Sequence, residues 1–191
     1  MSRQVVIKRL NTTMLVKIGL LSAITIVMGS TGLGFIPIQP FKLTIMHIPV
    51  IIGAILEGPL AGGLIGLMFG LFSIYQNLVN PTVVSFAFYN PLVSVLPRIL
   101  IGVSAYYVYK LFAKFNESVG IAVGAALGSL TNTVGVLGMI YILYLSEYLA
   151  AKGTTAKVVF SAGALNGSIE AVLAAVITLP IVFAVNKMKK K

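Results

Sequence analysis

Cysteine, tryptophan and aspartate are absent from this sequence, and histidine occurs once. Without cysteine there are no disulfides, thiolate metal sites or cysteine nucleophiles, and one histidine cannot form a histidine cluster around a metal. The sequence contains no G-x-x-x-x-G-K-[ST] loop, so we do not expect it to hydrolyse ATP alone. Its acidic residues are four glutamates, which disfavours an enzyme that works inside a membrane. We therefore expect no catalytic residues, no bound metal and no cofactor in this chain.

Charged residues are scarce as well, and apolar residues take their place. Charged residues make up 9% of the 191 residues and apolar residues 58%, and the mean hydropathy is +1.02. A water-soluble domain does not have this composition, which predicts an integral membrane protein. At roughly 20 residues per membrane-crossing helix, the apolar share is enough for about six spans. We expect an all-α membrane protein with a single substrate-binding domain over residues 1–191, because too few residues remain for a soluble catalytic domain.

The apolar residues fall into six segments separated by short polar or Gly/Pro-containing stretches. The second segment is short for a span and contains Pro49, and only Glu57-Gly58-Pro59 separates it from the third. If the two formed one long helix, there would be five spans and the termini would lie on opposite sides of the membrane. The six segments are residues 12–29, 43–56, 59–76, 91–109, 119–145 and 158–186.

The distribution of positive charge favours six spans with both termini in the cytoplasm. The net charge is +10, but the basic residues lie between apolar runs, which is typical of a topology signal and not of a nucleic-acid surface. Arg98 lies inside a span, and the outer side would hold Lys42, Lys152 and Lys157. The inner side would hold Arg3, Lys8, Arg9, Lys17, Lys110, Lys114, Lys187, Lys189, Lys190 and Lys191.

Polar residues within the apolar segments are the candidates for a binding site, because each must be paired or face a cavity. Arg98, Asn132 and Asn166 lie on three different segments, each about 10 to 12 Å from the outer surface if the helices are regular. The inner half is nearly free of polar residues, which indicates a pocket open to the outside, and we expect the outer loops at 30–42 and 77–90 to fold over its mouth. The full set of predicted ligand-binding residues is Arg98, Asn132, Asn166, Asn90, His47, Gln76 and Lys42.

Structural roles are the alternative for several of these residues. Arg98 could form a buried ion pair with Glu170, which lies one helical turn after Asn166 on the same face. The asparagines could bond to neighbouring backbone, and His47, next to Pro49, could cap or pack a helix. These alternatives remain open at the level of the sequence.

Small residues recur at a spacing of four in several segments. Such stripes allow two helices to approach closely. In the fifth segment, packing within the bundle is the simpler explanation for the stripe. In the first and third segments, an external partner helix is a serious alternative. The residues of those two stripes are Gly19 and Ala23 in the first segment and Gly62, Gly66 and Gly70 in the third.

Three stretches of the sequence resemble a known family of membrane proteins. They are KLTIMHIPVIIGAILEGPLAGGLIGLMFGLFS, NPLVSVLPRILIGVSAYYVYK, and the asparagine-bearing runs GSLTNTVG and ALNGSIEA. Together they are similar to the S-components of energy-coupling factor (ECF) vitamin transporters, and the HIPVIIGAI run and the Pro97-Arg98 pair resemble the branch that includes pantothenate, hydroxymethylpyrimidine, folate and cobalamin binders. The resemblance implies a pocket formed by outer loops and the last three spans, in a prokaryotic plasma membrane.

The same resemblance implies partners and a mechanism. The small-residue stripes of the first and third spans would contact a transmembrane coupling subunit, which two ABC-type ATPases drive with ATP and Mg²⁺. The loaded protein would topple in the membrane to release its cargo inside. An autonomous secondary transporter is the alternative from another class, disfavoured by the lack of an internal repeat and of a polar route through the inner half.

The charge of the predicted site favours an anionic cargo. Arg98 and Lys42 supply positive charge, and Asn132 and Asn166 supply amide groups. Pantothenate, with its carboxylate, amide and hydroxyl groups, satisfies this set. Folate is also anionic, but its pterin ring requires more aromatic stacking than the last three spans offer.

Overall fold

The computed structural model describes residues 11–38 and 41–189 as helices, one β-hairpin and short connections. Arg3, Lys8, Arg9, Lys190 and Lys191, used above to orient the chain, lie outside these residues. The described elements, in chain order, are α1 (Thr12–Thr31), β1 (Phe35–Ile38), β2 (Phe41–Thr44), α2 (Ile48–Glu57), α3 (Pro59–Val79), α4 (Ser85–Phe88), α5 (Pro91–Ser94), α6 (Leu96–Phe112), α7 (Glu117–Lys152) and α8 (Ala156–Lys189).

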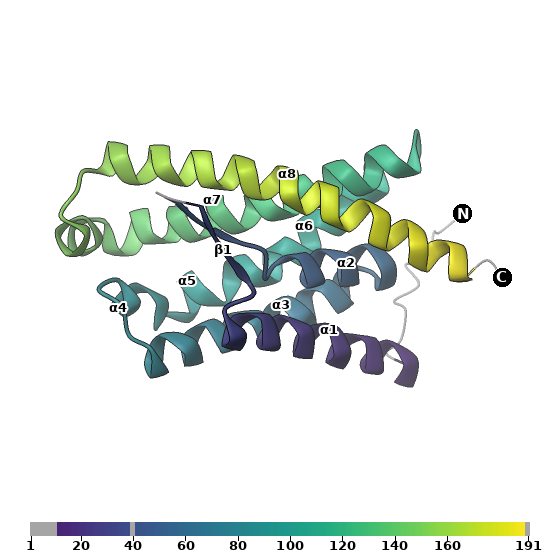
Figure 1. Ribbon diagram of the computed structural model, residues 1–191, viewed down its shortest axis with the longest axis horizontal. Coiled ribbons are helices and arrows are strands. Elements are labelled where there is room, and N and C mark those ends of the chain that lie inside the picture. Colours follow the sequence, from purple (N-terminus) through teal and green to yellow (C-terminus); the bar gives the residue numbers. More distant parts are fainter. Residues whose placement is uncertain (1–10, 39–40, 190–191) are drawn as a thin grey trace, which may run out of the picture.

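The long helices run side by side along one axis, and α1 begins at the same end of the bundle at which α8 finishes (Figure 1). Within residues 11–38 and 41–189, five helical stretches are long and apolar enough to cross a membrane, and each coincides with a predicted segment. The chain is therefore a multi-pass, mainly α-helical membrane protein, as the sequence predicts. The five stretches are Thr12–Thr31, Pro59–Val79, Pro91–Phe112, Glu117–Lys152 and Ala156–Met188.

The second predicted segment differs from expectation, because only its later part is a helix. Helix α2 has 10 residues, about 15 Å of rise, which is half of a typical hydrocarbon core of about 30 Å. Pro49 lies in its first turn, where a proline without an N–H is tolerated, and the first two residues of the predicted segment, 43 and 44, belong to β2 instead. The chain thus returns from the end of α1 through a hairpin and a half-length helix.

A sharp turn separates α2 from α3, as the Glu57-Gly58-Pro59 sequence predicts. Gly58 has φ of 106°, a conformation that favours glycine, and its N–H donates to the Ala54 carbonyl at 2.9 Å. Pro59 begins α3, where its missing N–H breaks no helical bond. The alternative of one long helix over the second and third segments is therefore wrong.

The glycines of α3 face α6 within the same chain. A β-carbon on Gly66 would overlap the main-chain carbonyl of Arg98, and one on Gly62 would lie 2.9 Å from the Cα of Gly102. A β-carbon on Gly70 would lie 2.7 Å from the Cα of Val95 in the same way. The prediction that Gly62, Gly66 and Gly70 dock an external partner is corrected accordingly, because the backbone of α6 already occupies the groove that they form.

The stripe of α7 also packs within the bundle, which was the favoured expectation. A β-carbon on Gly124 would lie 2.9 Å from the Ala105 carbonyl, and one on Gly128 would lie 2.9 Å from the Ala105 β-carbon. Helix α6 is therefore held between α3 and α7 at close range on both sides. This central position fixes the residues near its start, among them Arg98.

The hairpin extends from the end of α1 toward α8 (Figure 1). Strands β1 and β2 pair antiparallel with Phe35 opposite Thr44. At its base the Gly34 N–H donates to the Met28 carbonyl at 2.8 Å, and the Ile45 N–H donates to the Gly34 carbonyl at 2.9 Å. Residues 30–42 were expected to form an outer loop, and most of the hairpin lies within that range. A two-stranded hairpin accommodates proline, since each strand has an edge without a ladder bond.

Candidate functional site

A cavity of about 390 Å³ lies where the hairpin, the last turns of α3 and the first turn of α6 meet. This is the end of the bundle opposite to the start of α1 and the last turn of α8 (Figure 1). Both loops that were expected to cover the pocket contribute to its walls. The lining residues are Phe35, Thr44, Met46, Phe69, Ser73, Gln76, Asn77, Asn80, Thr82, Phe88, Arg98 and Asn132.

Arg98 places a buried positive charge in the wall of this cavity. Its side chain is 7% exposed, and one terminal nitrogen (Nη1) donates to the Val93 carbonyl at 2.6 Å. The guanidinium carbon lies 5.5 Å from the ring centre of Phe69 and 5.8 Å from that of Phe88, so two aromatic rings also hold the cation. The buried Nε has no hydrogen-bond partner within the described chain. The arrangement fixes the guanidinium but leaves it able to donate to an anion.

Arg98 and Glu170 form no ion pair in the described part of the chain. The Glu170 carboxylate instead accepts a hydrogen bond from the Thr44 N–H at 2.6 Å. The ion pair that the described residues contain joins Lys17 to Glu57, at the far end of the bundle. Among the residues that the structure describes, no carboxylate therefore forms an ion pair with the cation in the cavity.

Polar groups line the opposite walls of the cavity. Asn132 of α7 is 9% exposed, and its Oδ1 is buried without a partner among residues 11–38 and 41–189. Gln76 donates to the Gly29 carbonyl at 3.1 Å, which ties α3 to α1. Asn77 donates to the Ser73 carbonyl at 2.9 Å and accepts from the Ser85 hydroxyl at 2.6 Å. The amides of α3 therefore hold the wall together, while Asn132 keeps a free acceptor.

Of the other predicted ligand-binding residues, His47, Asn166 and Asn90 lie outside the cavity lining. His47, directly before α2, is fully buried, and neither ring nitrogen has a partner in the described structure. Asn166 in α8 also has a buried Oδ1 without a described partner. Asn90 caps α5 by accepting from the Leu92 N–H and donates to the Tyr144 hydroxyl at 3.1 Å. Lys42 lies in β2 opposite Pro37, and its side chain is outside the described part of the structure.

Several lining residues were missed by the sequence analysis. Phe69 and Ser73 lie seven and three residues before the predicted Gln76, on the same face of α3, and Asn80 follows four residues later at the end of this helix. That periodicity was a signal in the sequence. Thr44, Thr82 and Phe88 gave no such signal, because the loops bring them to the cavity.

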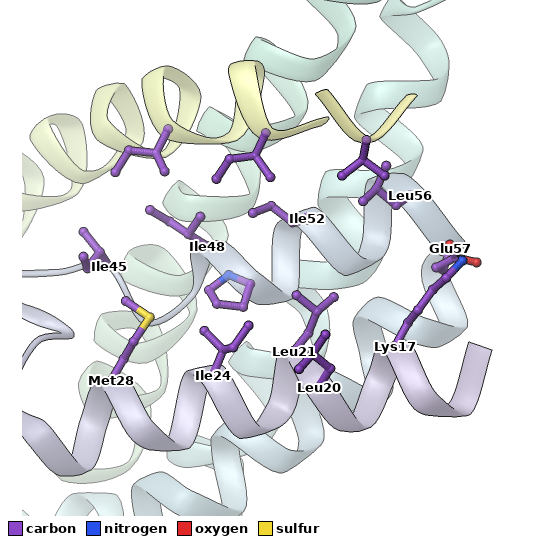
Figure 2. Close-up of a pocket in the computed structure, with 14 residues that line it drawn as sticks. Lys17, Leu20, Leu21, Ile24, Met28, Ile45, Ile48, Ile52, Leu56 and Glu57 are labelled. Atoms are coloured by element: carbon purple, nitrogen blue, oxygen red, sulfur yellow. Dashed lines mark hydrogen bonds and ion pairs between the residues drawn. The ribbon is translucent and has the colours of Figure 1, made fainter. Parts of the chain in front are cut away.

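A second, apolar groove of about 460 Å³ lies between α1 and α8, with α2 as its floor (Figure 2). Its walls are aliphatic, among them Leu20 and Ile24 of α1 and Ile52 of α2. The Lys17–Glu57 ion pair, with Nζ 2.6 Å from Oε1, lies at one end of it (Figure 2). Because the rest of the lining is apolar, this groove suits another hydrophobic surface and not a polar small molecule.

The outward face of α1 lies beside this groove. No described atom would lie within 4 Å of a β-carbon on Gly19, and Ala23 is exposed. These two small residues, unlike the glycines of α3, have open space in front of them.

Comparison with known proteins identifies similar chains. The family model described as "ECF transporter, substrate-specific component" matches residues 13–182. The pantothenic acid transporter PanT of Lactococcus lactis subsp. cremoris is 32% identical over 164 residues, which cover 78% of this chain and 81% of that protein. The pantothenate transporter PanT of Leuconostoc mesenteroides subsp. mesenteroides is 32% identical over 117 residues, which cover 55% of this chain and 56% of that protein.

Proposed function

Because the chain belongs to the family of substrate-specific components of ECF transporters, we propose that it is the membrane subunit that binds pantothenate for an ATP-driven importer. The names of its relatives support the vitamin, and those relatives are transporters, not enzymes. In this role the whole chain is one substrate-binding domain.

The observation that carries this proposal is the buried guanidinium of Arg98 in the wall of a cavity of about 390 Å³. This volume lies within the range of roughly 300 to 1,000 Å³ that is usual for small-molecule sites. A ligand carboxylate would accept hydrogen bonds from the guanidinium and supply the counter-charge that Glu170 does not. Cation and carboxylate in a site with little water make the strongest ordinary hydrogen bonds.

The remaining walls suit the rest of pantothenate. The free Oδ1 of Asn132 would accept from a ligand amide or hydroxyl group, and Thr44 and Ser73 offer hydroxyls. Phe35, Met46 and the two phenylalanines beside Arg98 offer apolar contacts to the ligand's branched carbon skeleton. An anionic ligand with an amide, hydroxyls and a methylated centre matches this combination.

In this proposal the chain crosses the membrane six times, and both termini lie in the cytoplasm. The hairpin and α2 together make the second crossing, and the five long helices make the others. The cavity then opens toward the outside of a prokaryotic plasma membrane. Two separate ABC-type ATPases bind Mg²⁺ and hydrolyse ATP, and this chain itself binds no nucleotide in the proposed mechanism.

The transmembrane coupling subunit docks, in our proposal, on the outward face of α1 and the groove beside it. Gly19 and Ala23 allow a partner helix to come close, and the aliphatic walls of the groove give it apolar surface to cover. The stripe of α3 takes no part, since α6 covers it.

Two measurements test the proposed function. Calorimetry on the purified chain should detect tight binding of pantothenate and no comparable binding of hydroxymethylpyrimidine, folate or cobalamin. Tight binding of one of these others with none of pantothenate would assign a different cargo. In vesicles, labelled pantothenate should enter only when the coupling subunit and ATPases are present with ATP, and uptake by this chain alone would indicate a secondary transporter.

A further inference from the structure

Glu170 is a buried carboxylate in a membrane helix, and nothing proposed so far uses it. It is 7% exposed, and it forms no ion pair with any Lys or Arg whose side chain the structure describes. A charged residue at this position in a membrane protein is costly, which points to a specific use. Its hydrogen bond to the Thr44 N–H, at 2.6 Å, joins residues 126 positions apart.

The pairing of the hairpin explains why Thr44 needs an acceptor from outside. The Ile45 N–H donates to the Gly34 carbonyl, so Gly34 and Ile45 are a hydrogen-bonded pair. In an antiparallel ladder the next pair, Phe35 and Thr44, is then a pair without hydrogen bonds, and its N–H groups point away from the partner strand. The Thr44 N–H therefore lies on the free edge of β2, and Glu170 of α8 accepts from it.

This edge belongs to the wall of the ligand cavity. Thr44 and Phe35, opposite one another at the base of the hairpin, both line the cavity. The bond from the Gly34 N–H to the Met28 carbonyl fixes the hairpin to α1 on one side. On the other side, the bond to Glu170 connects it to α8, which strand β2 contacts.

We propose that Glu170 is a positioning residue that fastens the free edge of β2 to α8 and so holds the hairpin closed over the pantothenate cavity. The proposal rests on the proposed function for the identity of the ligand. It assigns the carboxylate a role as a hydrogen-bond acceptor, and it requires no direct contact between Glu170 and ligand. Loss of the acceptor frees one edge of the hairpin, so bound ligand leaves faster.

Two substitutions separate the acceptor from the charge. Glu170→Met removes the acceptor and leaves an apolar side chain of similar length, which suits a membrane helix. Glu170→Gln removes the charge but keeps an oxygen that accepts from the Thr44 N–H. Ser168→Ala is the matched control on α8, since the Ser168 hydroxyl is exposed and donates to the Ala164 carbonyl of its own helix.

The first readout is the dissociation rate of labelled pantothenate from purified protein. Glu170→Met should raise it about tenfold or more, while Glu170→Gln and Ser168→Ala should stay within about threefold of wild type. The proposal is overturned if Glu170→Met releases ligand like wild type, or if Glu170→Gln releases it as fast as Glu170→Met.

The second readout needs no ligand and keeps the two proposals apart. Hydrogen exchange at the Thr44 amide of the empty protein should be faster in Glu170→Met and near wild type in Glu170→Gln. If wild type binds no pantothenate but exchange follows this pattern, the proposed cargo fails and the fastening role stands. If wild type binds pantothenate and exchange at Thr44 does not change in Glu170→Met, the fastening role fails alone.

A variant on the strand covers the case in which Glu170→Met does not fold. Thr44→Pro removes the N–H donor at a strand edge, where proline is tolerated. It should speed ligand release more than Thr44→Val, which also loses the hydroxyl in the cavity wall but keeps the N–H. Adding Glu170→Gln to Thr44→Pro should have no further effect on the rate. An additional increase in the double variant would contradict the proposal, because the carboxylate would then act on something other than Thr44.

Discussion

Gly66 has no room for a β-carbon, and adding one should destabilise the contact between α3 and α6. That carbon would overlap the main-chain carbonyl of Arg98 and come within 3.1 Å of the Ile99 Cα. Both obstacles are backbone atoms, so the strain is relieved only if one helix moves away from the other. Gly63 is the matched control in the same helix, since its β-carbon would meet only the Ile99 side chain, at 3.8 Å.

The expected magnitudes follow from these contacts. Overpacking of a close contact costs about 1 to 3 kcal/mol, while replacing a helical glycine with alanine gains about 0.5 to 1 kcal/mol. Gly63→Ala receives only the gain, and Gly66→Ala receives both terms. The two variants should therefore differ by about 1 to 3 kcal/mol in the free energy of unfolding, with Gly63→Ala the more stable.

Thermal unfolding in detergent, followed by circular dichroism, measures this difference. For a chain of this length about 2 to 4 °C corresponds to 1 kcal/mol, so the two midpoints should differ by at least about 2 °C. Pantothenate affinity should fall in Gly66→Ala as well, because the displaced carbonyl belongs to Arg98. If Gly66→Ala is as stable as Gly63→Ala and loses only partner binding, the glycines of α3 face a partner after all and the packing argument is refuted.

Three further predictions concern the cavity, the docking face and the loop over the cavity. Arg98→Lys keeps the positive charge but loses the planar set of donors of the guanidinium. Calorimetry should therefore show pantothenate affinity weakened about tenfold or more. Wild-type affinity in this variant would contradict a role of the guanidinium geometry. Gly19→Leu should leave pantothenate affinity intact but abolish uptake in vesicles and pull-down of the coupling subunit. Gly19→Ala is the control, and normal uptake by Gly19→Leu would exclude this face of α1 as the docking site. Tyr144→Phe removes the hydroxyl that accepts from Asn90 at 3.1 Å, so it should lower the free energy of unfolding by about 0.5 to 1.5 kcal/mol. Tyr141→Phe, at a 55% exposed position, should have no effect, and equal midpoints for the two variants would count against the bond.

Much of the fold follows from the sequence, because a membrane fixes the length of the apolar segments. Gly58 and Pro59 together also mark the break between α2 and α3, since one adopts a positive φ and the other begins a helix. The shortness of α2 could not be predicted in the same way. Leu43 and Thr44 continue into the apolar run of α2, but pairing with β1 takes them into the hairpin, and Thr44 is also held by Glu170 of α8, which lies far away in the sequence.

The sequence predicted those residues of the candidate site whose polar or charged side chains are unusual within an apolar segment. Arg98 stands out for this reason, and Asn132 and Gln76 joined it in the cavity. A small-residue stripe indicates close approach but not which helix approaches, so the neighbour of Gly66 could not be inferred. The spacing of Ser73 and Asn80 on one face of α3 was readable, whereas the approach of Thr44 depends on a contact with α8.

The contact between Arg98 and the carboxylate of pantothenate is central to the proposed function. Calorimetry with pantothenate and with pantothenol, which replaces that carboxylate with a neutral hydroxymethyl group, tests it in wild type and in Arg98→Ala. Wild type should bind pantothenate roughly 10- to 150-fold more tightly than pantothenol, as expected for a charge-assisted bond of about 1.5 to 3 kcal/mol. Arg98→Ala should bind both ligands weakly and with similar affinity. Equal affinity of wild type for the two ligands, or undiminished preference for pantothenate in Arg98→Ala, would contradict the account.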